Sequence, residues 1–141
     1  MNGKWGKRWF TAGSVFLLLL GLVHSLSLIK RLVPANATEK QLLDLMTGYQ
    51  FNLLGSMRSM DNLLRGFSIS FTLGMLAMGG VCLVLRRERA GLLKRVALVN
   101  VIWLAAMNAV TLRYFFAVPT AFLAAGLILF VLAWAMLPAE G

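Results

Sequence analysis

The sequence predicts an all-α polytopic membrane protein, built as one domain over residues 1–141. We expect a four-transmembrane-helix bundle with a short external helical segment between helices 1 and 2. Hydrophobic residues make up 60% of the chain and charged residues only 13%, whereas a soluble domain has about 25% charged residues. The apolar residues form long continuous runs without the period-two alternation of a β-barrel. A large apolar surface must therefore face lipid.

Four apolar segments have the length of membrane spans or approach it. A helix of roughly 20 apolar residues crosses the ~30 Å hydrocarbon core of a bilayer. The segments cover residues 10–29, 66–85, 96–112 and 118–137. The third is short, so we expect the aromatic residues at 114–116 to complete it at the interface.

The first span resembles a cleaved signal peptide in two respects. Basic residues precede it, and Ala35, Asn36 and Ala37 have the A-x-A form of a cleavage site. However, Lys30 and Arg31 lie between the apolar stretch and that site, and the stretch is longer than a signal peptide usually needs. We expect the first span to be retained.

The orientation is predicted from lysine and arginine, which are enriched in cytoplasmic loops. The N-terminal tail and the loop between spans two and three hold eight of them in dense clusters. The opposite side holds six, spread mainly over the longer loop at residues 30–65. We therefore expect a bacterial inner membrane protein with both termini in the cytoplasm. The six are Lys30, Arg31, Lys40, Arg58, Arg65 and Arg113.

The external loop at residues 30–65 contains signals for a short helix. Pro34 ends the first helix, and Thr38 followed by Gln41 fits a capping box. Gly48 and Gly55 interrupt the helix. The apolar residues that follow lie at helical spacing and predict one apolar face on the membrane surface or on an outward extension of the second span. These are Leu53, Met57, Met60, Leu64 and Phe67.

Small residues recur at a spacing that lets transmembrane helices approach closely. The short segment 113–119 predicts an antiparallel hairpin of spans three and four, with Pro119 in the first turn of the fourth helix. The small residues form two sets, Gly66, Ser70 and Gly74, and Ala117, Ala121 and Ala125.

Five polar residues near the predicted outer boundary form the candidate ligand-binding pocket. Ionisable residues in a membrane are costly and are functional candidates by default. His24 lies in the outer part of the first span, and Asp61 and Arg65 are four apart on a predicted helix, where they can pair. Asn108 and Arg113 lie near the outer end of the third span. The alternatives are a histidine satisfied by interhelical hydrogen bonds and arginines that only snorkel to the interface.

Two asparagines and one cysteine lie within the spans. We expect Asn100 and Asn108 to form hydrogen bonds with neighbouring helices. Cys82 is the only cysteine, which excludes an internal disulfide and a cysteine-based metal site. We expect Cys82 to act as a small apolar residue inside a helix.

Motifs for catalysis, metals and cofactors are nearly absent. The chain lacks a nucleotide-binding glycine loop, a G-x-S-x-G motif and a set of metal ligands. His24 and Asp61 are the only acid–base pair worth considering, and haem ligation by His24 with a methionine is disfavoured. We expect no metal or cofactor, and an enzyme that acts on a lipophilic molecule, with His24 or Asp61 as the acid–base group, stays an open alternative to a protein without activity. The basic residues border apolar segments, as juxtamembrane charges do, so no nucleic-acid partner is expected.

A resemblance supports the same architecture. Residues 61–68, with His24 upstream and residues 113–119 downstream, resemble a group of small uncharacterised bacterial four-helix membrane proteins. The general layout is similar to that of the DoxX-like family. The first resemblance implies topology and no activity, and the second implies layout alone.

Three functions fit these observations. The first is a protein that binds a lipid, quinone, isoprenoid or sterol-like molecule, with the five polar residues orienting its polar end. The second is an accessory or scaffold subunit with a membrane-protein partner, or a homo-oligomer. The third is a small transporter, which the absence of a regular row of charges along any span disfavours.

Overall fold

The computed structural model describes residues 2–29 and 33–139. Lys30 and Arg31, which we assign to the outer loop, lie outside the described residues. The chain divides into two units. Unit 1 consists of Met1–Leu20 and Met75–Gly141, and unit 2 of Gly21–Gly74. A single domain over the whole chain stays a prediction.

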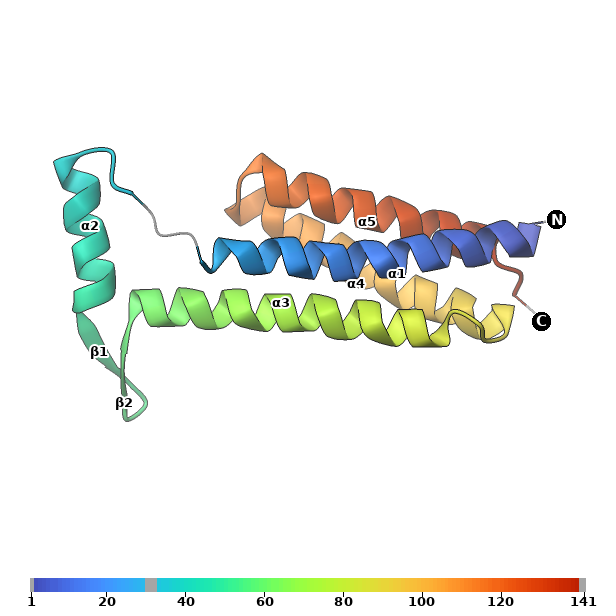
Figure 1. Cartoon of the computed structure of the whole chain (residues 1–141), viewed down its shortest axis with the longest axis horizontal. Coiled ribbons are helices and arrows are strands. Elements are labelled where there is room, and N and C mark those ends of the chain that lie inside the picture. Colours follow the sequence, from blue (N-terminus) through green and yellow to red (C-terminus); the bar gives the residue numbers. More distant parts are fainter. Residues whose placement is uncertain (1, 30–32, 140–141) are drawn as a thin grey trace. The chain divides into compact units, whose positions relative to one another are not determined.

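Four long helices confirm the predicted fold class (Figure 1). They are α1 (Asn2–Ser27), α3 (Met60–Leu85), α4 (Ala90–Tyr114) and α5 (Ala117–Met136). Each is long and apolar enough to cross a membrane, so the chain is a polytopic membrane protein. The helices α1, α3 and α4 extend beyond the predicted spans because a helix can continue past the hydrocarbon core into its polar flanks. Pro119 lies in the first turn of α5, as predicted.

In unit 1, glycines bring α1 and α5 into close antiparallel contact. A Cβ added at Gly6 would lie 2.9 Å from the backbone nitrogen of Leu137, and one added at Gly13 would lie 2.9 Å from the ring of Phe130. Phe10 packs edge-on against Phe130, with 5.8 Å between ring centroids. Only glycine leaves room for this approach.

The other helix pairs of unit 1 pack through similar small residues. A Cβ at Gly79 of α3 would lie 2.9 Å from the backbone oxygen of Ser14 on α1. On α5, Gly126 faces Leu104 of α4. The fully buried core of the unit is mainly apolar and comprises Phe10, Leu17, Met75, Cys82, Leu93, Ala97, Leu104, Phe130 and Ala133.

The close approaches do not occur at the first predicted set of small residues. A Cβ added at Gly66 or Gly74 would meet no heavy atom within 4 Å. The prediction that this set packs α3 tightly against a neighbour was therefore wrong for these two glycines. The spacing identified small residues correctly, but it could not show which face of α3 meets another helix.

Two lysines join elements at one end of unit 1. Lys7 Nζ donates to the carbonyl oxygen of Glu88, at 2.7 Å, just beyond the end of α3. Lys94 Nζ donates to the carbonyl oxygen of Leu137, at 2.8 Å, at the end of α5. Cations at helix C-termini stabilise the unpaired carbonyl groups there. We call this end the basic end, and its cationic residues are Lys4, Lys7, Arg8, Arg86, Arg87, Arg89, Lys94 and Arg95.

Unit 2 contains the predicted external helix, α2 (Ala37–Gly48). Its N-cap is Asn36, whose side-chain oxygen accepts from the backbone N–H of Glu39 at 2.8 Å. The prediction that the helix starts at Thr38 was therefore wrong, because Asn36 supplies the cap two residues earlier. The helix ends at Gly48, as predicted.

A β-hairpin follows α2, and the sequence did not predict it. Strand β1 (Gln50–Leu53) pairs antiparallel with β2 (Ser56–Ser59). Leu54 and Gly55 form the turn with φ values of 49° and 88°, and the side-chain oxygen of Asn52 accepts from the Gly55 N–H at 2.8 Å. Two-residue turns with two positive φ values match the twist of a hairpin.

The hairpin overturns part of the predicted apolar stripe. Leu53 and Met57 lie on β1 and β2 and not on a helix. Met60, Leu64 and Phe67 lie on α3 and are all exposed, which fits an outward extension of the second span. In unit 2, α2 runs across the direction of α3, as Figure 1 shows.

Candidate functional site

His24 lies in the last turn of α1, in unit 2. Its ring packs edge-on against Phe71 of α3, with 4.8 Å between centroids. The Nε2 atom is buried and has no hydrogen-bond partner among the described residues. No hydrogen bond from a neighbouring helix in the described residues therefore satisfies Nε2, contrary to the alternative interpretation of His24. A buried polar atom without a partner costs about 1–3 kcal/mol and calls for an explanation.

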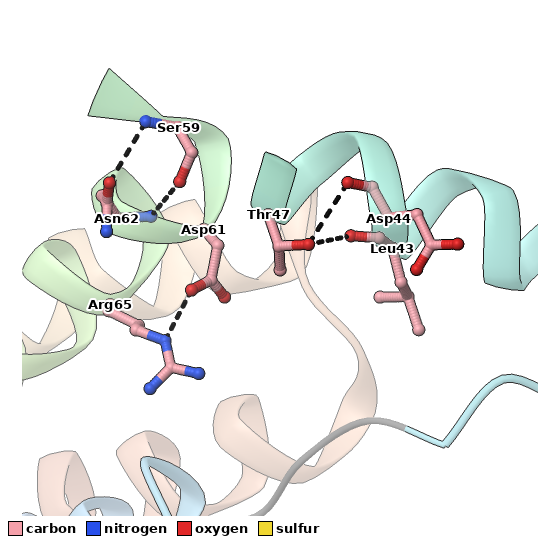
Figure 2. A network of polar contacts seen from close by, with 7 residues as sticks. All are labelled: Leu43, Asp44, Thr47, Ser59, Asp61, Asn62 and Arg65. Carbon is pink, nitrogen blue, oxygen red and sulfur yellow. Dashed lines mark hydrogen bonds and ion pairs between the residues drawn. The ribbon is translucent and has the colours of Figure 1, made fainter. Parts of the chain in front are cut away.

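Asp61 and Arg65 form the predicted ion pair in the first turns of α3 (Figure 2). Arg65 Nε donates to Asp61 Oδ2 at 2.7 Å. The side chain of Arg65 is 55% exposed and that of Asp61 is 33% exposed. A pair this exposed contributes little to stability. The two terminal nitrogens of Arg65 point away from Asp61 in Figure 2 and are available to an anion.

A reciprocal cap fixes the start of α3 and thereby the position of the ion pair. The backbone N–H of Asn62 donates to Ser59 Oγ, and the backbone N–H of Ser59 donates to Asn62 Oδ1, both at 3.2 Å (Figure 2). This is a capping box in which asparagine takes the place of glutamate or glutamine. Asp61 also lies in the first turn, where the helix dipole favours a negative charge.

Asn108 and Arg113 lie on α4, in unit 1. Asn108 Nδ2 donates to the carbonyl oxygen of Leu104 at 2.9 Å, and Asn108 is nearly buried. Its amide therefore bonds to its own helix and not to a neighbour, which corrects our expectation for this residue. Arg113 is exposed in the last turn of α4, where a cation suits the helix dipole.

The structure divides the five predicted residues between the two units. His24, Asp61 and Arg65 belong to unit 2, and Asn108 and Arg113 to unit 1. Within unit 2, Asp61 and Arg65 contact each other and His24 contacts Phe71. A pocket formed by all five residues stays a prediction.

Asn100 is the second buried polar group without a full set of partners. Its Nδ2 donates to the carbonyl oxygen of Val96 at 2.9 Å and approaches Cys82 Sγ at 3.4 Å. Asn100 thus contacts its neighbour α3, as predicted, while Cys82 is fully buried as a small core residue. The Oδ1 atom of Asn100 has no partner among the described residues.

A cavity of about 430 Å³ in unit 2 was not predicted from the sequence. Arg58 of β2 borders it, and polar, small and aromatic residues of α3 line the rest. The sequence contains polar or small residues four apart at positions 62, 66 and 70, a spacing that predicts one face of a helix. The hairpin that brings Arg58 to this face was not predicted. The lining residues are Arg58, Asn62, Leu63, Gly66, Phe67 and Ser70.

No group of histidine, cysteine, aspartate and glutamate that would hold a metal ion occurs within residues 2–29 and 33–139. In comparisons with known proteins, no family model, no curated protein and no solved structure matched the chain.

Proposed function

We propose that this polytopic membrane protein binds a lipophilic molecule by its polar end, in a pocket of unit 2 that includes His24, Asp61 and Arg65. The observation that carries the proposal is the buried Nε2 atom of His24, which lacks a partner in the described chain. A neutral imidazole has one donor and one acceptor nitrogen. A hydroxyl or carbonyl group of a bound lipid, quinone, isoprenoid or sterol-like molecule would satisfy it.

Arg65, which belongs to the same unit as His24, favours a ligand with an anionic or strongly polar end. Arg65 uses Nε for Asp61 and keeps its two terminal nitrogens for another acceptor. Phe71 supplies an aromatic contact beside the imidazole. Sites for lipophiles usually combine an apolar lining with a few polar groups of this kind.

We propose that the pocket lies toward the outer leaflet of a bacterial inner membrane, with both chain termini in the cytoplasm. The support is the basic end of unit 1, which holds eight of the fourteen lysines and arginines. Cytoplasmic flanks carry this excess of positive charge. A reporter enzyme that works only in the cytoplasm should be active when it is fused to the C-terminus. A fusion that is well expressed but inactive would show the opposite orientation.

The decisive experiment is native mass spectrometry of the protein after gentle extraction from its own membrane. We expect a stoichiometric added mass on the wild type and its loss in His24→Ala. Ser27→Ala is the matched control, because Ser27 lies on the same turn and its hydroxyl only bonds to the His24 carbonyl oxygen. Full retention of the mass in His24→Ala, with an unchanged melting temperature, would refute the pocket.

A second function, as an accessory or scaffold subunit, is favoured by the exposed apolar residues of the external segment. Among the described residues of α2, none is buried, and the turn residue Leu54 is fully exposed. A membrane-protein partner would cover such residues. A protein subunit that co-purifies in fixed stoichiometry and is lost in Leu54→Asn would favour this function. Exposed members of this surface are Leu42, Leu45, Tyr49, Leu53 and Leu54.

A further inference from the structure

A shallow, open groove of about 720 Å³ lies on the surface of unit 1, lined by residues of α1 and by Leu129 of α5. Lys7 and Arg8 border one end of it, and the remaining lining is almost entirely apolar. The only other polar lining residue is Thr11, whose hydroxyl already donates to the Lys7 carbonyl oxygen at 2.9 Å. The groove thus combines two cations at one end with an apolar channel.

The two cations are held in place by contacts within unit 1. Lys7 Nζ donates to the Glu88 carbonyl oxygen, which uses one of its three N–H donors. The Arg8 guanidinium lies over the ring of Trp5, 4.8 Å from its centroid, in a cation–π contact. Both charges therefore remain at the mouth of the groove, with donors free for an anion.

The surroundings of the mouth are strongly positive. It belongs to the basic end, with its eight lysines and arginines. Glu88 is the single acidic side chain in the described part of unit 1. A phosphate group at this position would meet two fixed cations and a wider positive field.

The apolar part of the groove has the dimensions of an acyl chain. Arg8 and Leu19 are eleven positions apart on α1, which is about 16 Å at ~1.5 Å per residue. One leaflet of the hydrocarbon core is about 15 Å thick. The small side chain of Ala12 leaves space in the groove, and the other apolar lining residues are Val15, Phe16 and Leu19 on α1 and Leu129 on α5.

We propose that this groove is a binding site for one anionic phospholipid, with its phosphate at Lys7 and Arg8 and one acyl chain along Ala12, Val15 and Leu19. The site uses residues other than those of the proposed function, so either site can fail without the other. An apolar groove alone would accept any lipid, and a cation pair alone would accept any anion. Their combination selects for both parts of the ligand.

The test is native mass spectrometry of the full chain with added phosphatidylglycerol or phosphatidylcholine of identical acyl chains. The wild type should bind phosphatidylglycerol in preference. Substituting both Lys7→Gln and Arg8→Gln should weaken that binding about 30-fold, from about 1 kcal/mol for each cation. Because Lys7 also contacts Glu88, Arg8→Gln alone serves as a second variant and should weaken binding several-fold.

Two further variants separate the site from general attraction to the basic end. Lys4→Gln with Arg95→Gln removes the same charge outside the groove and should leave the preference intact. Ala12→Phe keeps every charge and fills the channel, and it should also abolish phosphatidylglycerol binding. The proposal is overturned if the Lys4 and Arg95 substitutions act as strongly as those at Lys7 and Arg8, or if Ala12→Phe binds normally. Displacement by millimolar inorganic phosphate would equally overturn it, by showing an anion site without an acyl-chain channel.

Discussion

In the described part of unit 1, three side-chain hydrogen bonds join residues far apart in the sequence, from Lys7, Lys94 and Asn100. In the described part of unit 2, every side-chain hydrogen bond joins residues at most four positions apart, as the Ser59–Asn62 cap does. Unit 1 is thus held by tertiary contacts, whereas the polar contacts of unit 2 are caps, turns and neighbouring ion pairs. We therefore expect substitutions in unit 1 to affect the whole unit, and substitutions of polar residues in unit 2 to affect a single element.

The largest contrast is expected between two glycines of α3. Gly79→Ala would place its Cβ about 3 Å from backbone atoms of Ser14 and Leu18, so α1 and α3 would have to separate, at a cost of about 1–3 kcal/mol. Gly66→Ala meets no neighbour and should be neutral or stabilise the helix by up to about 1 kcal/mol. Thermal unfolding in one detergent measures both. Equal changes in melting temperature for the two variants would contradict the expected difference between Gly79 and Gly66.

A smaller effect is expected at the basic end. Lys94→Met removes the charged hydrogen bond to the Leu137 carbonyl oxygen and should lower the free energy of unfolding by about 1.5 kcal/mol. The matched control is Arg95→Met, since Arg95 is exposed on the same helix. Chemical denaturation of both variants measures the loss in the free energy of unfolding of each. A similar loss in Arg95→Met would show that net charge, and not the bond, matters.

In unit 2 we expect a local effect at the hairpin turn. Leu54 has a φ of 49°, which disfavours leucine, and asparagine tolerates this region better. Leu54→Asn should stabilise the hairpin by about 1 kcal/mol without changing the melting temperature of the bundle. Hydrogen exchange of the backbone amides of β1 and β2 measures it. Leu53→Asn, within β1, is the control, and an equal gain there would refute the explanation.

The smallest effect is a pH dependence in α2. The hydrogen bond from Lys40 to Asp44, 2.8 Å long, and the attraction between their charges raise the pKa of Lys40 above its usual value. The stabilisation that the raised pKa represents is therefore present at neutral pH and is lost as the pH rises through that pKa. Asp44→Asn should lower the pKa of Lys40 toward its usual value. An NMR titration that finds the same pKa in both proteins would contradict this.

Much of the fold could be predicted because the length of an apolar run can be read from a short stretch of sequence. The four helices and α2 follow from apolar runs and helix stop signals such as Gly48. The hairpin was missed because Leu53 and Met57 also fit a helical period, and because a leucine at a positive φ is unusual before Gly55. A pattern of apolar residues alone does not show where the backbone reverses direction.

The candidate site was predictable only in part, for a different reason. The Asp61–Arg65 pair depends on a spacing of four along one helix, and it is present. The environment of His24 depends on Phe71, 47 positions away, and Asn108 turned out to bond to its own helix. Contacts between distant segments depend on which helix faces meet, and residue spacing does not contain that information.

The antiparallel contact of α1 with α5 has a consequence for the order of assembly. Phe10 and its ring partner Phe130 are 120 residues apart. At about 5–20 residues per second, synthesis of that interval takes roughly 6 to 24 seconds. During this time the surface of α1 around Gly6 and Gly13 has no α5 to cover it. The nascent chain therefore presents a closely packing glycine surface to the membrane, and to whatever machinery inserts it, until the last helix arrives.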